Sequence, residues 1–289
     1  MKKRILFIGA GKVAWHLSYA LNKKGYVISG ISSRNRLSAK RLASEFRANW
    51  TTKPEKIVKD ADILFITTPD AEIKSVVKKL CSKGAIKKKQ LVIHTSGLLE
   101  AKVLDCVKKL GALSLSIHPC FSFADRSYKV DEVKGVFFAL EGTKETVKMG
   151  KTIVHKLGGK PFVIEKGKKP LYHLALVFAS NFFVGIEDMA IELLLECGIG
   201  KKDAIELIKP LIDVTEKNIW KNGALKALTG PVKRGDMETL KKHLILLVKQ
   251  KRSFDKIYKE VSKHLLRMIE KNGEVEKHKI EAMKKILSV

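Results

Sequence analysis

The sequence predicts an α/β domain with a mostly parallel sheet, followed by an all-α domain. Within residues 1–166, short apolar runs alternate with helical patterns, which is typical of βαβ units. Two of these runs, at 5–8 and 63–66, both read "ILFI", as expected of strands buried on both faces. From residue 167 onward the apolar spacing is helical throughout. We therefore expect a first domain over 1–166 and a second over 167–289.

The pattern also places the individual elements. Strands are expected in the runs RILFIG, YVISGI, DILFIT, QLVIHT, LSLSIH, GVFFAL and PFVIE, and helices between them at 12–24, 36–47, 70–82 and 143–157. In the second domain a helix should begin at Pro170 and stop at Cys197, before two glycines. Its apolar part, 174–186, is expected to be buried, because that stretch is too short to cross a bilayer. Further helices are expected at roughly 201–221, 236–249, 251–271 and 274–287.

Composition limits the classes of partner. The net charge of +27, from 57 basic and 30 acidic residues, raises the possibility of nucleic-acid binding. Most of the basic residues are Lys and are spread along the chain, so a solvated lysine surface is favoured over a nucleic-acid site. The four cysteines lack C-x-x-C or metal-ligand spacing. We expect reduced thiols, a cytoplasmic location, no metal site and no membrane anchor.

A glycine-rich loop follows the first strand. Gly9, Ala10, Gly11, Lys12 and Val13 stand where the strand should give way to a helix. Glycines in this pattern allow a tight turn and let the backbone approach a pyrophosphate, and the helix N-terminus supplies N–H groups to it. The alternative is a glycine turn needed only for packing. Because strand, loop, helix and second strand fall in register, we favour a dinucleotide-binding (Rossmann) domain.

The end of the second strand predicts which dinucleotide is bound. NAD-binding domains place a carboxylate there for the ribose 2′-hydroxyl. The chain has no acidic residue among 27–36, and has Ser32, Ser33 and Arg34 instead, with Arg36 nearby. Such groups donate hydrogen bonds to a 2′-phosphate and neutralise it. This predicts NADP(H), although a polar loop with one solvent-facing Arg is an alternative interpretation.

Other polar residues follow strands at the carboxyl edge of the predicted sheet, where open α/β domains bind ligands. Thr67, Thr68 and Pro69 follow one strand, and Thr95 follows another, so we assign these residues to the cofactor site. His94 and His118 end neighbouring strands and should lie near the nicotinamide. Each histidine could instead be a hydrogen-bonded loop residue.

The second domain offers further candidates. His173 and Ser180 are seven residues apart on the expected helix and share a face, and Asn181 lies within reach of it. A polar trio on an apolar helix needs partners, which are either a substrate or other helices. Arg234 could hold a substrate carboxylate, or could pair with Asp236 at the start of the next helix.

Taken together, "GAGKVA", "SSR", "TTPD", "HTSG", "HP", "YHLALVFASN" and "LTGPVKRGD" resemble a family of Rossmann-like NADP oxidoreductases. The C-terminal part of that family is known as domain of unknown function 2520. The family is distantly similar to 6-phosphogluconate, prephenate and ketopantoate dehydrogenases or reductases, and to pyrroline-5-carboxylate reductase. The resemblance implies that the helical domain closes the active site and forms a dimer. In some of those enzymes a Lys begins the substrate-facing helix, and in this sequence His173 occupies the corresponding position.

The leading hypothesis is an NADPH-dependent oxidoreductase that reduces a small oxo or imino acid, which could be ketopantoate-like. His173 would donate the proton, Asn181 and Ser180 would orient the substrate, and Arg234 would hold its carboxylate. His94 and His118 would shape the pocket. The alternative is an NADP-binding sensor or scaffold protein without turnover. We also expect a homodimer, because residues 171–195 are apolar on nearly all sides.

Overall fold

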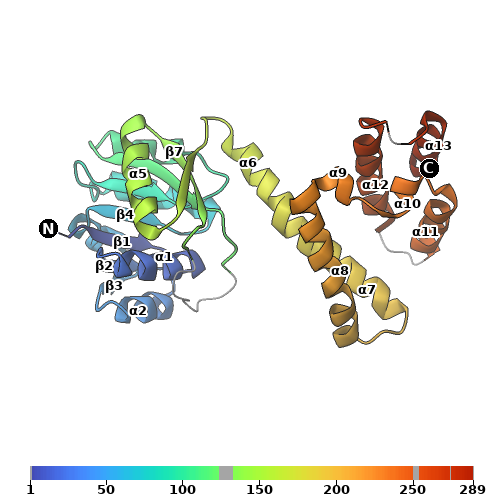
Figure 1. The fold of residues 1–289 in the computed structure, drawn as a ribbon. Helices are drawn as coiled ribbons and strands as arrows, with labels where there is room; N and C mark the ends of the chain where they lie inside the picture. The colour runs from blue at the N-terminus through green and yellow to red at the C-terminus, as the bar shows by residue number, and fades with distance from the viewer. Residues whose placement is uncertain (1, 124–132, 250–253, 274, 289) are drawn as a thin grey trace. The chain divides into compact units, whose positions relative to one another are not determined.

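A computed structural model describes residues 2–123, 133–249, 254–273 and 275–288 of the chain (Figure 1). The chain divides into two compact units, Met1–Asn181 and Phe182–Val289. The strands lie in the first unit and the described part of the second is helical, which confirms the predicted fold class. Strands give way to helices near the expected 166/167 boundary. The compact units divide later, because the first turns of the next helix contact the sheet domain.

In the described residues the sheet has eight strands in the order β3-β2-β1-β4-β5-β6-β7-β8. Their bounds are β1 (Arg4–Ile8), β2 (Val27–Ser32), β3 (Asn49–Thr51), β4 (Ile63–Ile66), β5 (Leu91–His94), β6 (Leu113–Pro119), β7 (Phe137–Gly142) and β8 (Lys160–Val163). All pairs are parallel except β6 with β7. The carboxyl ends of β1, β2, β4, β5 and β6 therefore lie at one edge. The three-residue β3 was not predicted.

Two layers of helices cover the sheet. The helices of the first unit are α1 (Lys12–Lys23), α2 (Arg36–Ser44), α3 (Asp70–Ser82), α4 (Asp105–Lys108), α5 (Lys144–Leu157) and α6 (Lys169–Leu176). Ile5 and Phe7 of β1 pack into a core cluster with α1, α2 and α5, whereas Leu6 and Ile8 pack into a second cluster with α3 and α4. Both faces of β1 are thus buried, which explains its uninterrupted apolar sequence.

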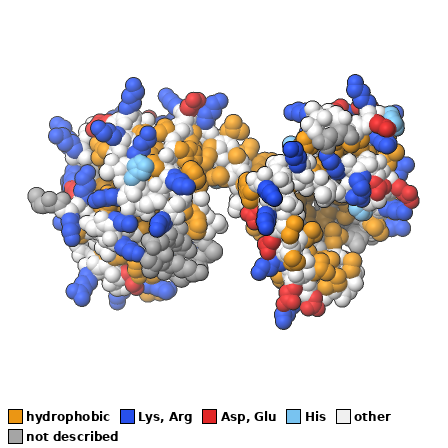
Figure 2. Space-filling view, in the orientation of Figure 1, with side chains coloured by type: hydrophobic (Ala, Val, Ile, Leu, Met, Phe, Trp, Pro, Cys, Tyr) orange, Lys and Arg blue, Asp and Glu red, His pale blue; other side chains and the backbone are white. Residues whose placement is uncertain are grey.

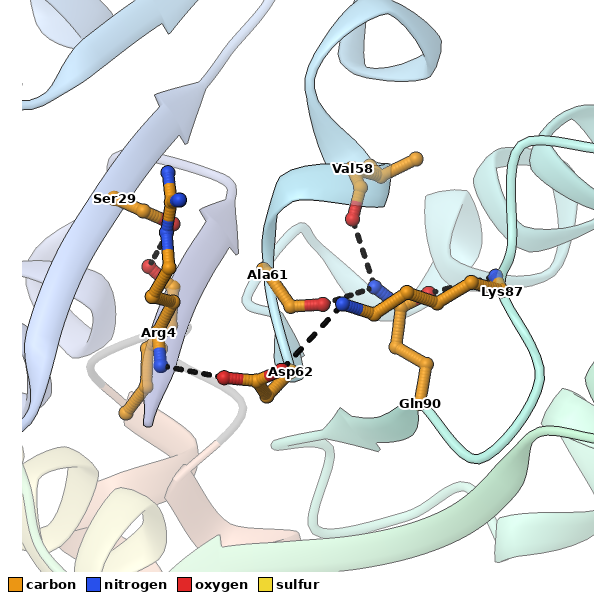
Figure 3. A network of polar contacts seen from close by, with 8 residues as sticks. Arg4, Ser29, Val58, Ala61, Asp62, Lys87 and Gln90 are labelled. Atoms are coloured by element: carbon orange, nitrogen blue, oxygen red, sulfur yellow. Dashed lines mark hydrogen bonds and ion pairs between the residues drawn. The ribbon is translucent and has the colours of Figure 1, made fainter. Parts of the chain in front are cut away.

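The amino edge of the sheet is held by polar contacts (Figure 3). The Asp62 carboxylate accepts a hydrogen bond from the Arg4 backbone N–H at 2.9 Å and pairs with Lys87 at 3.4 Å. The buried Gln90 amide donates to the Val58 and Ala61 carbonyls at 2.7 and 2.8 Å. These polar groups satisfy one another, so this edge has a structural role.

The helices of the second unit are α7 (Phe183–Glu196), α8 (Lys201–Asn222), α9 (Ala224–Ala227), α10 (Gly230–Arg234), α11 (Met237–Lys249), α12 (Phe254–Glu270) and α13 (Lys277–Ser288). The short α9 and α10 were not predicted. Residues of α10 to α13, such as Val232, Leu240, Leu266 and Met283, form a hydrophobic core of their own.

The long helix after β8 differs from its prediction. It runs from Lys169 to Glu196 as α6, a π-helical turn over Val177–Phe182, and α7. The expectation that residues 174–186 are too short to cross a bilayer concerned only part of this helix, which is 28 residues long and could cross a membrane by length and composition alone. This is weak evidence, because the core helix of a soluble protein passes the same test. The expectation of a buried helix is wrong. Phe178 and Val184 are 62% and 66% exposed.

Candidate active site

The loop between β1 and α1 requires its first glycine. Gly9 has a φ of +112°, and a Cβ added there would lie 2.5 Å from the Thr67 carbonyl oxygen. Gly11, by contrast, has open space around an added Cβ. It is the N-cap of α1, and that helix has neither a capping side chain nor an acidic residue in its first turn. The positive end of α1 is therefore free to face an anion.

This loop opens on a cavity of about 560 Å³, within the size range of cofactor sites. The cavity contains every predicted cofactor residue except Lys12, namely Gly9, Ala10, Gly11, Val13, Ser32, Ser33, Arg34, Thr67, Thr68, Pro69 and Thr95. Lys12 is exposed at the first position of α1. Within the part of the chain that the structure describes, the buried Thr68 Oγ1 has no hydrogen-bond partner. Because buried hydroxyls are normally paired, a bound molecule is a suitable partner, and the open space at Gly11 leaves room for a pyrophosphate.

Arg34 stands at the cavity where a carboxylate would mark an NAD site. Its guanidinium Nη1 lies 3.1 Å from Glu72 Oε1 on α3, and the arginine side chain is 79% exposed. An ion pair this exposed contributes little, so a phosphate can displace it. The guanidinium of Arg36, by contrast, lies 5.4 Å from the centre of the Trp50 ring. Arg34 is therefore the better placed of the two for a 2′-phosphate.

A second, smaller cavity of about 270 Å³ adjoins the helix after β8. It brings together four predicted catalytic residues, His118, His173, Ser180 and Asn181. Ala179, Ser180 and Asn181 line it in succession. All three lie in the π-helical turn over Val177–Phe182, in which successive side chains are separated by a smaller angle than in an α-helix.

The two cavities meet at one loop. Ser96 lines the larger cavity, and the two imidazoles of the smaller one approach the next residue, Gly97. A Cβ added at Gly97 would lie 2.7 Å from His173 Cδ2 and 2.9 Å from His118 Nε2. Only a glycine lets both rings sit this close to the backbone.

His118 belongs to a chain of hydrogen bonds. Its Nδ1 lies 2.8 Å from the Tyr172 hydroxyl, which lies 2.6 Å from Cys120 Sγ. Burial lowers the pKa of His118 to about 4, and the charges of Lys169 and His173 act in the same direction. Burial also raises the pKa values of Tyr172 and Cys120. At neutral pH the side chains of His118, Tyr172 and Cys120 are therefore all uncharged. His118 can thus hydrogen-bond a substrate without carrying a charge.

Comparison with known families agrees with this geometry. A Rossmann-like domain model matches residues 2–119, and the model of domain of unknown function 2520 (DUF2520) matches residues 136–265. The chain is a Rossmann-like protein with a DUF2520 domain. The DUF2520 match includes β7 and β8, so that domain is not purely helical. It also contains His173, Ser180, Asn181 and Arg234.

Solved structures share the fold. A Bacteroides fragilis protein described as a "putative NADP oxidoreductase", BF3122, is 24% identical, with a TM-score of 0.76 over 91% of this chain and 98% of that one. Protein TM1727 of Thermotoga maritima is 29% identical, with a TM-score of 0.69 over 93% and 99%. A reductive aminase of Aspergillus terreus, in complex with NADPH and ethyl levulinate, is 13% identical, with a TM-score of 0.67 over 100% and 99%. A search of curated proteins finds no match.

Two predicted residues of this Rossmann-like DUF2520 protein lie outside both cavities. His94 is fully buried, and its Nδ1 accepts a hydrogen bond from the Ser96 N–H at 3.3 Å. Burial lowers its pKa to about 3. Val92, two residues earlier, packs in the second core cluster, and strand alternation sends His94 to the same face. His94 therefore lies on the core side of β5, holds the Ser96 backbone through this hydrogen bond and lines neither cavity.

Arg234 ends α10 in the second unit of the DUF2520 protein. Its guanidinium is 64% exposed and lies 4.0 Å from the Asp236 carboxylate. Asp236 in turn accepts hydrogen bonds from the N–H and hydroxyl of Thr239 at 3.0 and 2.7 Å. This is the alternative arrangement, in which Arg234 pairs with Asp236 at the start of α11. A substrate-binding role for Arg234 stays a prediction.

Sequence reasoning missed Lys169. It is the first residue of α6 and only 1% exposed. Its Nζ donates to the Ser96 carbonyl at 2.6 Å and to the Ser116 hydroxyl. Neighbouring lysines at 166 and 168 make this stretch of the DUF2520 domain look like a solvated surface. The resemblance to enzymes with a lysine at the start of this helix was the signal that could have identified it.

Proposed function

We propose that the protein is an NADPH-dependent oxidoreductase that reduces a small, anionic oxo or imino acid. The observation that carries the proposal is the meeting of the nucleotide cavity with the histidine-lined cavity at Ser96 and Gly97. A dinucleotide held at Gly9 and Arg34 would direct its nicotinamide toward that loop, since open α/β domains bind ligands along this edge. The smaller cavity then has the size and polarity of a substrate site.

The residues of that cavity have distinct roles in the proposed reaction. NADPH held at Gly9 and Arg34 would supply the hydride that the carbonyl or imine carbon needs. His173 donates the proton that the oxygen or nitrogen then needs. Neutral His118 donates a hydrogen bond to the substrate, and Ser180 and Asn181 orient it through their polar groups. The apolar Leu176 and Val177 reduce access of water to the reacting atoms.

The similarity to a reductive aminase in complex with NADPH supports this class of reaction through a shared fold. The test is a panel of oxo acids and imino acids, with NADPH consumption followed by absorbance. Steady, substrate-dependent consumption is the expected result. Tight NADPH binding without any turnover would favour the alternative of a sensor or scaffold protein.

We expect a preference for NADPH over NADH of at least about tenfold, or about 1.4 kcal/mol. The reason is the charged contact between Arg34 and the 2′-phosphate. Calorimetric titration of both cofactors measures it, and Arg34→Ala should remove most of the preference. Arg36→Ala is the matched control and should bind NADPH like the wild type, because its guanidinium lies on Trp50. Equal affinities for the two cofactors in the wild type would refute the assignment.

We also propose that the protein is a homodimer formed through its helical unit. Figure 2 shows orange side chains at the surface of this unit. The most exposed large apolar residues of α7 and α8 are Val184, Leu207, Leu211, Val214 and Trp220. A two-fold pair is the commonest way to cover such a surface.

Light scattering should give twice the mass of one chain, and Leu211→Lys should shift the measured mass toward that of a monomer. Leu37→Lys, at a leucine that is 77% exposed on α2, should not. A stable wild-type monomer at micromolar concentration would contradict the proposal.

A further inference from the structure

One buried ammonium group joins three segments that are distant in the sequence. Lys169 begins α6, Ser96 follows β5, and Ser116 lies within β6. The Lys169 Nζ donates to the Ser96 carbonyl at 2.6 Å and to the Ser116 hydroxyl. A buried charge without hydrogen-bond partners is costly, so the Lys169 ammonium group needs these two acceptors. The position of α6 on the sheet domain therefore depends on these contacts.

Among the described residues Lys169 makes no direct salt bridge, yet its surroundings keep it charged. Burial lowers its pKa to about 8, and the carboxylates of Glu141, Asp70 and Glu100 oppose that effect. The ammonium form consequently predominates at neutral pH. Its positive charge acts on two histidines, since it lowers the pKa values of both His94 and His118.

The contacts of Lys169 extend to both cavities. Toward the nucleotide, the Ser96 hydroxyl donates to the Asp70 carboxylate at 2.6 Å, and both residues line the larger cavity. Toward the substrate, α6 carries Tyr172 and His173 one turn after Lys169. The Tyr172 hydroxyl contacts His118 Nδ1, and His173 lies over Gly97. A displacement of the start of α6 would therefore move the histidine pair relative to the nucleotide loop.

We propose that Lys169 is a positioning residue, which fixes α6 to the Ser96 loop and so holds His118 and His173 in place beside the nucleotide cavity. Its effect on turnover rests on the proposed function, but its effect on His118 does not. The groups that face His118 are Tyr172 and His173 of α6, Cys120 after β6, and Lys169 itself. Of these, only Lys169 carries a charge that a neutral isostere would remove without changing the cavity lining.

The test is Lys169→Met, with the histidine signals followed by NMR across a pH titration. Loss of the nearby cation should raise the pKa of His118 above its wild-type value of about 4. Because burial is the larger cause and remains, the pKa should stay below that of an exposed histidine. NADPH affinity should change little, and turnover should fall by about 10²-fold if the histidines move by about 1 Å. Lys168→Met, at the exposed neighbour, is the matched control and should leave His118 unchanged.

A second measurement needs only the wild-type protein. Deprotonation of Lys169 near pH 8 should shift the His118 signals, although His118 is itself already neutral there. This shift of the His118 signals near pH 8 tests the proposal even if Lys169→Met fails to fold. Absence of the shift near pH 8, or an unchanged pKa of His118 in a folded Lys169→Met variant, would overturn the proposal. An altered pKa of His118 in a protein without oxidoreductase activity would support it while refuting the proposed function.

Discussion

His173→Ala should lower turnover by about 10²- to 10⁴-fold, the usual contribution of a general acid. His173 lines the smaller cavity and is absent from the lining of the nucleotide cavity. The substitution removes the proposed proton donor and leaves the dinucleotide contacts at Gly9, Gly11 and Arg34 intact. NADPH affinity should therefore stay within a few-fold of the wild-type value.

Two measurements check this expectation. Calorimetry gives the affinity for NADPH, and steady-state kinetics with the substrate found in the panel give the rate. His155→Ala, at an exposed histidine of α5, is the control and should behave as the wild type. Near-wild-type turnover in His173→Ala would exclude His173 as the proton donor and move the assignment to His118.

Gly97→Ala should lower turnover by about 10²-fold, the cost of misplacing reacting groups by about 1 Å. Its φ is outside the left-handed region, so an alanine there strains no backbone dihedral. The added Cβ would instead lie 2.7 Å from His173 and 2.9 Å from His118, so both rings must move away. NADPH affinity should change less than turnover does, because Gly97 does not line the nucleotide cavity.

Gly185→Ala is the matched control for this substitution. Gly185 also has an ordinary φ, and open space surrounds the position of its Cβ. Gly185 is the third residue of α7 and lies inside the continuous helix Lys169–Glu196, where an alanine should stabilise the helix by up to about 1 kcal/mol. Unfolding midpoints and turnover of both variants complete the test. Unchanged turnover in Gly97→Ala would mean that the two histidines do not act as a fixed pair.

Much of the sheet domain could be predicted because its strands are short, apolar and mostly separated by helical patterns. The sequence "ILFI" at β1 and β4 fills both layers of the core, as expected. The antiparallel pairing of β7 with β6 could not be predicted, because the spacing of apolar residues carries no information on strand direction. The three residues of β3 were too few to show a period.

The site was partly predictable for the same reason. Residues at or just after the carboxyl ends of strands, such as His118 and Thr68, lie at the carboxyl edge because parallel strands end there. Strand alternation could also have shown that His94 lies on the core side, with Val92. The burial of Lys169 depends on contacts with Ser96 and Ser116, far away in the sequence. No local pattern distinguishes it from the exposed lysine beside it.

The π-helical turn at Val177–Phe182 affects how this chain should be compared with others. Such a turn corresponds to one residue inserted into an α-helix. If the same residues formed a regular α-helix, the side chains at 180 and 181 would lie about 100° further around the helix and about 1.5 Å from their present positions along it. An alignment with a protein whose helix is regular here therefore needs a one-residue gap. If that gap is omitted, residues of different orientation are paired, and a substrate-facing position in one protein is equated with an outward-facing position in the other.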